Sequence, residues 1–182
     1  MNVNLVNENS VIIYFSDTVC TETADNIAHA CHSLRSELSD TLLDIVPSYT
    51  SILLSCDLRK TGLQSFVARI RIILNQLEKG CRDTLERKQI VLPVYYGEEV
   101  ALDHAEISQH AGLAFSEVVE LHTSECYRVF AIGFAPGFAY LGNTPAQITM
   151  PRKANPRPKV PKGSVAIADR QTAIYPRQSP GG

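Results

Sequence analysis

A basic, proline-rich segment carries the side chains best suited to bind an anion. Residues 151–164 hold five cations and four prolines and no acidic residue. Arginine can contact a phosphate or a carboxylate through two parallel hydrogen bonds. Proline restricts the backbone, so less entropy is lost when the cations are aligned. The segment therefore fits an anion site, and a solvated basic strap is the alternative interpretation.

A glycine- and aromatic-rich segment lies shortly before it. Residues 133–142 contain three glycines and three aromatic residues. The pair Pro136-Gly137 predicts a type II turn, because proline presets φ and glycine accepts a positive φ. Two interpretations stay open. In one, the turn fills a small barrel with aromatic rings, and in the other its bare backbone lets a ligand approach N–H groups between aromatic walls.

Several familiar sites are missing from the sequence. Lys162-Gly163-Ser164 has the wrong order for a phosphate-binding Walker A loop, and neither G-x-S-x-G nor G-x-G-x-x-G occurs. The five cysteines are widely spaced and form no C-x-x-C pair, which argues against a disulfide framework and a zinc site. We therefore expect no resident metal.

Charge divides the chain into two parts. The net charge is -2, but residues 127–182 hold eight basic residues and one acidic residue, whereas the rest hold nine basic and eighteen acidic residues. Because one segment alone is basic and the whole chain is slightly acidic, nucleic-acid binding is not expected. The sequence has no secretory signal and no apolar run near the ~18 residues of a membrane span. We therefore expect a cytoplasmic protein that does not bind a membrane.

The elements of the first part alternate between strands and helices. Strands are predicted at residues 11–15, 43–46, 51–56 and 89–96, and apolar stripes predict helices at residues 24–38 and 63–77, with Thr21 or Thr23 as a cap and Gly80 as a stop. This order is typical of the split βαβ pattern of a ferredoxin-like α+β domain. We assign that domain to residues 1–92.

The second part, residues 93–182, is predicted to be mostly β. Two short helices are expected first, at residues 103–110 and 116–122, on either side of Ala111-Gly112. A buried strand is expected at residues 127–132, because β-forming residues dominate there. His104 and His110 are interpreted as structural or solvent-exposed.

Six motifs in order give the chain a family resemblance. They are Gly-Phe-Ala-Pro-Gly-Phe-Ala-Tyr-Leu (133–141), Pro-Arg (151–152), Pro-Arg (156–157), Val-Pro-Lys-Gly-Ser-Val (160–165), Gln-Thr-Ala-Ile-Tyr-Pro (171–176) and Ser-Pro-Gly-Gly (179–182). Together with residues 44–54 and 121–122 they resemble the KipI family, also called allophanate hydrolase subunit 1 or 5-oxoprolinase subunit PxpB. The resemblance implies a cyclophilin-like β-barrel after the α+β domain, and a second subunit of the KipA or PxpC type.

The resemblance also implies a reaction, which is the ATP-dependent opening of the 5-oxoproline lactam to glutamate, with Mg²⁺ accompanying ATP. Arg152, Arg157 and Lys162 would hold phosphates. Phe134, Phe138 and Tyr140 would wall the pocket around Pro136 and Gly137, with Gly163, Ser164, Gln171 and Tyr175 also contacting the ligand. His122 is a candidate acid or base, with a structural role as the alternative.

Two departures from the family pattern bear on these expectations. Ala173 stands where the family has glycine, which would cost stability at a position of positive φ. The family also continues beyond the position of Gly182, so an incomplete barrel is expected. Two alternative functions are inhibition of a sensor histidine kinase and hydrolysis of allophanate or another amide.

Overall fold

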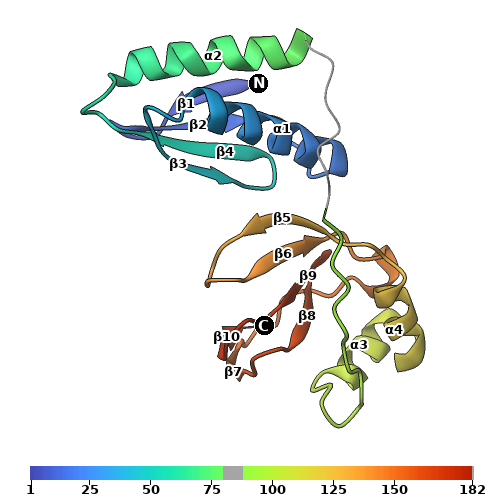
Figure 1. Cartoon of the computed structure of the whole chain (residues 1–182). Helices are drawn as coiled ribbons and strands as arrows, with labels where there is room; N and C mark the ends of the chain where they lie inside the picture. The colour runs from blue at the N-terminus through green and yellow to red at the C-terminus, as the bar shows by residue number, and fades with distance from the viewer. Residues whose placement is uncertain (80–87, 182) are drawn as a thin grey trace. The chain divides into compact units, whose positions relative to one another are not determined.

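The chain forms two compact units, Met1–Lys88 and Gln89–Gly182. The structure is a computed structural model that describes residues 1–79 and 88–181 (Figure 1). Both units mix helices with strands, and every strand pairing described is antiparallel. The coarse expectation of a mixed helix-and-strand chain is confirmed. The ferredoxin-like and cyclophilin-like assignments stay predictions.

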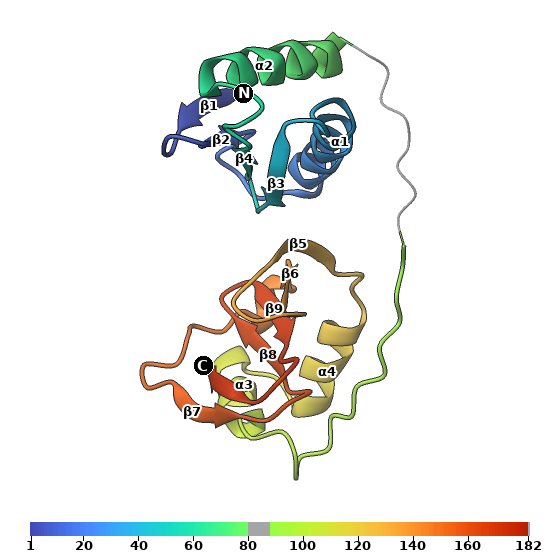
Figure 2. The ribbon, with the colours of Figure 1, turned by 60° about the vertical axis from the view of Figure 1, so that its left-hand side comes forward.

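The first unit is a four-stranded sheet covered by two helices. The strands are β1 (Asn2–Leu5), β2 (Ser10–Tyr14), β3 (Leu42–Pro47) and β4 (Ser51–Cys56), in the order β1-β2-β4-β3. The helices are α1 (Thr21–Glu37) and α2 (Leu63–Lys79). Figure 2 shows both helices on the same side of the sheet.

The core of this unit lies between the helices and one face of the sheet. Ile13 pairs with Ile52, and Val11 pairs with Leu54, so these four apolar side chains share a face and are fully buried. The predicted helical stripes meet that face, because Ile27, Leu34, Leu38, Phe66, Ile70 and Leu74 belong to the same buried cluster.

One predicted strand is wrong. Residues 89–96 belong to no sheet in the described part of the chain. Pro93 interrupts this segment and cannot donate to a strand ladder. The edge of the sheet beside β2 is instead filled by β1, whose short Asn-Val-Asn-Leu alternation is the signal that could have identified it.

The predicted cap of the first helix is also wrong. Cys20 is the N-cap residue and makes no side-chain capping bond. The Thr23 hydroxyl is directed backwards and donates to the Thr18 carbonyl at 3.3 Å. The predicted stop at Gly80 lies outside the described residues.

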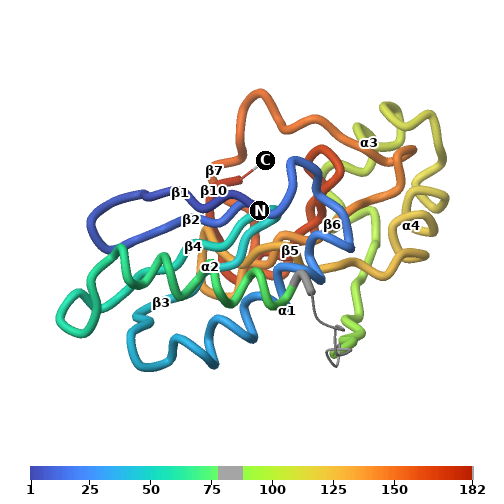
Figure 3. Tube along the Cα trace, turned by 90° about the horizontal axis from the view of Figure 1, so that it is seen from above, coloured from blue at the N-terminus to red at the C-terminus, as the bar shows by residue number. Residues whose placement is uncertain are grey.

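The second unit opens with two helices that lie side by side (Figure 3). These are α3 (His104–Ala111) and α4 (Phe115–Thr123), as the sequence predicts. A four-stranded sheet then has the order β5-β6-β9-β8, and a separate pair joins β10 to β7. The elements are β5 (Arg128–Ile132), β6 (Ala139–Gly142), η1 (Ala146–Ile148), β7 (Arg157–Val160), β8 (Val165–Ala168), β9 (Gln171–Ile174) and β10 (Ser179–Gly181).

Ala173 is an ordinary strand residue. It lies in β9, pairs with Ala166 of β8, and is not among the non-glycine residues with a positive φ. The strain expected from replacing a glycine therefore does not arise. In the described ranges 1–79 and 88–181, no helix has the length and hydrophobicity to cross a bilayer.

Candidate functional site

The Pro136-Gly137 turn has the geometry that the sequence predicts. The Phe138 N–H donates to the Ala135 carbonyl at 2.9 Å, and Gly137 has a φ of 82°. A hydrogen bond of this kind with a positive φ at the third residue defines a type II turn. Just before it, the Ala135 N–H donates to the Gly133 carbonyl at 2.7 Å across Phe134, whose φ is 64°. The two consecutive turns bring the Phe134 and Phe138 rings together.

Three aromatic rings then gather around Phe138, and we call the four residues the Phe138 cluster. The Phe138 centroid lies 5.2 Å from Phe134, 4.9 Å from Tyr140 and 5.3 Å from Tyr175, each in an edge-to-face arrangement. Phe138 is 6% exposed and Tyr175 8%, whereas Phe134 is 62% exposed. Of the aromatic residues predicted to wall a ligand pocket, Phe138 and Tyr175 therefore serve as core, and Phe134 is the ring most open to a ligand.

A second turn of the same type lies against this cluster. The Ser164 N–H donates to the Pro161 carbonyl at 3.2 Å, and Gly163 has a φ of 84°. The Gly163 N–H donates to the Tyr175 carbonyl at 2.7 Å, and the Tyr175 N–H donates to the Ser164 carbonyl at 2.9 Å. Tyr175 thus joins the turn that carries exposed Lys162 to the Phe138 cluster.

The left-handed conformation of Gly163 allows a direct test of this turn. We expect Gly163→Ala to lower the free energy of unfolding of the second unit by about 1 kcal/mol, since a Cβ is strained at a positive φ. Space is not the cause, because a Cβ there would meet no atom within 4 Å. Urea unfolding measures the loss.

Gly133→Ala is the matched control for that substitution. Its φ lies outside the left-handed range and a Cβ there would have its nearest neighbour at 4.0 Å. Equal losses in the two variants would contradict the assignment of the Gly163 turn.

The basic segment does not present all of its cations to solvent. Arg157 Nη2 forms an ion pair with Asp103 Oδ1, and Lys153 Nζ lies 3.0 Å from the same oxygen. Lys153 Nζ also lies 2.6 Å from Glu106 Oε2. We call these four residues the Asp103 cluster. No local pattern signalled it, because Asp103 and Glu106 lie about 50 positions before their partners.

The other two predicted phosphate ligands are more open. Arg152 Nε lies 3.8 Å from Asp169 Oδ2, and both side chains are largely exposed, so this pair is weak. Lys162 is exposed on its turn. Gln171 lies at the start of β9, where it pairs with Gly142 of β6. These residues come from separate strands and turns of the second unit.

His122 lies elsewhere in the unit, in a buried chain of hydrogen bonds. The Thr172 hydroxyl donates to the Ala166 carbonyl at 3.1 Å and therefore accepts from His122 Nε2, which is 2.9 Å away. Nδ1 is then unprotonated and accepts from the Tyr96 hydroxyl at 2.7 Å. Both ring nitrogens are occupied, so this geometry favours the structural alternative over an acid or base.

Burial gives His122 its electrostatic character. The side chain is buried, and desolvation lowers its pKa. Burial also raises the pKa of Tyr96, and it raises the pKa of Tyr127, whose hydroxyl donates to the His122 carbonyl, to about 12. The group is therefore neutral near pH 7. Thr172 is the member that the motif at 171–176 contained without being recognised as functional.

Comparison with known proteins places the whole chain. The family model described as carboxyltransferase domain, subdomain C and D matches residues 1–182. The chain belongs to this family.

Named relatives support the resemblance stated from the motifs. A 5-oxoprolinase subunit of Bacillus subtilis (strain 168) is 31% identical over 99% of this chain and 78% of its own length. The Haemophilus influenzae protein of the same name is 28% identical over 100% of this chain and 83% of its own length. The resemblance to the KipI and PxpB family is therefore confirmed.

Solved structures agree on the fold. The crystal structure of TTHA0988 superposes with a TM-score of 0.76 and 35% identity, over 96% of this chain and 33% of that chain. This chain thus spans a third of TTHA0988. The Kluyveromyces lactis urea carboxylase gives a TM-score of 0.71 at 12% identity, over 99% of this chain and 18% of that chain, and shows the fold alone.

Proposed function

We propose that this chain is a subunit of an ATP-dependent 5-oxoprolinase and opens the 5-oxoproline lactam to L-glutamate together with a partner subunit. The observation that carries the proposal is the match to the 5-oxoprolinase subunit of Bacillus subtilis over 99% of this chain. A subunit name implies other subunits, so we expect the chain to need a partner, of the PxpC or KipA type, for activity.

The chemistry asks for groups that bind phosphate. A lactam resists water, and transfer of the γ-phosphoryl group of ATP to its carbonyl oxygen would activate it while ADP leaves. Water then adds to the activated carbon, and the ring C–N bond breaks with a proton passing to nitrogen. A second water releases phosphate from the acyl phosphate and leaves glutamate. Negative charge on the transferred group is stabilised by fixed cations.

Arginine and lysine side chains of the second unit supply those cations in this proposal. Arg157 is the best placed, because Asp103 already holds its guanidinium in one orientation. Lys162 and Arg152 are exposed and can move toward a phosphate. The exposed Phe134 ring beside Phe138 offers an apolar surface for the ligand.

Magnesium is not assigned to residues of this chain. Within the described residues, no group of three or more His, Cys, Asp or Glu side chains could hold a metal ion. Mg²⁺ usually keeps several waters and binds through substrate phosphates. In our proposal it therefore enters with ATP, and no step is derived through a protein metal site.

The activity test uses this chain purified in complex with its partner subunit. We expect ATP-dependent release of glutamate from 5-oxoproline, and we expect Arg157→Ala to lower kcat/KM by about 100-fold or more, as for the loss of one charge-stabilising group. Arg71→Ala is the matched control, because Arg71 is an exposed arginine of α2 in the first unit. No glutamate release by the soluble complex, or equal rates for the three proteins, would reject the proposal.

The two alternative functions receive no comparable support. The urea amidolyase of Kluyveromyces lactis is 9% identical and shows the fold alone, so allophanate hydrolysis gains nothing from it. Inhibition of a sensor histidine kinase stays a prediction from the family resemblance. Kinase autophosphorylation at saturating concentrations of this chain tests it directly.

A further inference from the structure

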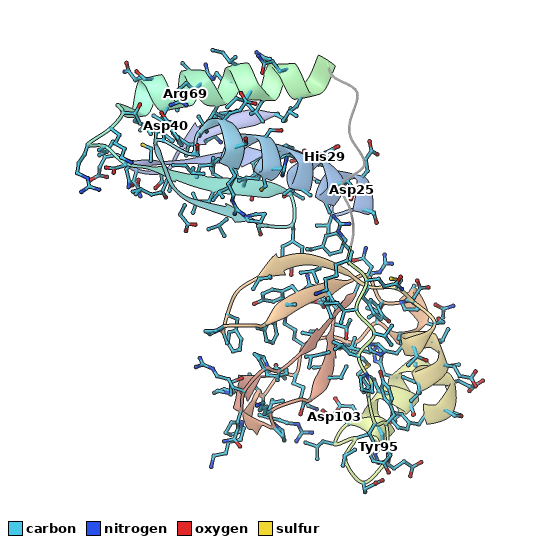
Figure 4. All side chains as sticks on the ribbon, in the orientation of Figure 1. Asp25, His29, Asp40, Arg69, Tyr95 and Asp103 are labelled. Atoms are coloured by element: carbon cyan, nitrogen blue, oxygen red, sulfur yellow. The ribbon has the colours of Figure 1, made fainter. Side chains whose placement is uncertain are left out.

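The orientation of Arg157 depends on one acidic residue from a distant part of the chain. Asp103 precedes α3 and accepts from Arg157 Nη2 on β7 (Figure 4). The same Asp103 oxygen lies 3.0 Å from Lys153 Nζ, and Lys153 is in turn held by Glu106 at 2.6 Å. Each of the two cations therefore has a fixed anionic partner.

Asp103 occupies a position where its carboxylate would normally serve the helix. It is the N-cap residue of α3, and aspartate at that position usually accepts from a backbone N–H of the first turn. Here it makes no capping hydrogen bond. Its charge is directed at the cations instead. Partial burial alone would raise the pKa of Asp103, but hydrogen bonds from Arg157 and Lys153 outweigh it and keep the pKa low.

Arg157 keeps donors that Asp103 does not use. Its side chain is 34% exposed, and Asp103 is its only acidic partner in the described ranges. The Nε atom is buried and has no hydrogen-bond partner in the described structure. Nε and Nη2 together form one edge of the guanidinium fork, and Asp103 Oδ1 contacts this edge through Nη2 alone. The fork is therefore held in place while part of its donor capacity stays unused.

We propose that Asp103 is a positioning residue that orients Arg157 to bind a phosphate oxyanion through its remaining N–H groups. The inference deepens the proposed function, since it takes that oxyanion to be a phosphate of ATP. An arginine side chain free in solvent loses rotamer entropy when it binds, and a side chain held in advance loses less. Lys153 and Glu106 complete the arrangement by holding the shared oxygen of Asp103.

A matched pair of variants separates positioning from simple charge. Asp103→Asn and Glu106→Gln each remove one negative charge from the same cluster, but only Asp103 contacts Arg157. If net charge governs the site, both variants bind an anion more tightly. If Asp103 positions Arg157, Asp103→Asn binds the anion more weakly and Glu106→Gln does not.

The experiment is a calorimetric titration of the full chain with inorganic pyrophosphate at fixed ionic strength. We expect Asp103→Asn to weaken binding about five- to tenfold, the cost of ordering one long side chain. Glu106→Gln should bind as tightly as the parent chain or slightly more tightly. Asp103→Glu, which restores a carboxylate, should recover part of the loss, a result that a general loss of structure would not give.

Three results would overturn the positioning role. These are tighter binding by both neutralised variants, the same affinity in Asp103→Asn as in the parent chain, or absence of pyrophosphate binding by the parent chain. Thermal unfolding of each variant checks that the second unit is folded. A complex without glutamate release whose pyrophosphate affinity still depends on Asp103 would reject the proposed function and leave the positioning role standing.

Discussion

Replacing Phe138 with alanine is expected to lower the free energy of unfolding of the second unit by about 3–5 kcal/mol. Phe138 is 6% exposed and lies at the centre of its cluster, in contact with the rings of Phe134, Tyr140 and Tyr175. The truncation would remove the buried ring, open a cavity and break three edge-to-face pairs. It would do so in a unit whose core is small, because the buried members of this cluster are Ala135, Phe138, Val160 and Tyr175.

The measurement is urea unfolding of the full chain, with hydrogen exchange resolved by segment to assign the loss to residues 89–181. Phe134→Ala is the matched control, since it removes the same side chain from the same turn at a position that is 62% exposed. We expect it to cost less than about 1 kcal/mol, as is usual for exposed positions. If the two variants lose equal stability, Phe138 is not the packing centre of the second unit.

The buried His122 chain predicts a second large effect. We expect His122→Ala to cost about 3 kcal/mol, because it leaves the Tyr96 hydroxyl and Thr172 Oγ1 without their partner in a buried setting. Thermal or urea unfolding of the second unit measures the loss. Thr123, next in sequence, is exposed and its hydroxyl bonds within α4, so Thr123→Ala is a control expected to be mild.

The same histidine also predicts a pH dependence with a definite sign. Burial lowers its pKa in the folded chain below the ordinary value of 6.5, so the unfolded chain binds its proton at a higher pH than the folded chain. Its contribution to stability is therefore complete above about pH 6.5 and is lost as the pH falls toward the folded pKa. Tyr96 and Tyr127, whose rings contact His122, stay neutral through this range.

Unfolding of the parent chain between pH 5 and pH 8 tests this sign. We expect His110→Gln, which changes an exposed histidine on α3, to keep the acid-side loss, and His122→Ala to reduce it. A second unit that becomes more stable on acidification would show that His122 is charged in the folded chain. The hydrogen-bond directions assigned to Tyr96 and Thr172 would then be wrong.

Local features of this chain were determined by the sequence alone. The stripes of α1 and α2, the pair α3 and α4, and the turn at Gly137 were all predictable, because periodicity and turn chemistry involve residues a few positions apart. β1 was missed because four residues of alternating pattern carry little signal. The strand predicted at residues 89–96 failed because a β-forming segment also needs an edge to pair with.

The candidate site was decided mainly by the tertiary structure. Composition indicated a basic segment without acids, yet the fold brings Asp103 against Arg157 across 54 positions and so pairs that cation with a carboxylate. His122 lies in a motif of the family, but its role follows from Thr172, 50 positions later. Charge and hydrogen bonding depend on which groups packing brings within about 3 Å, and no local pattern in the chain encodes that distance.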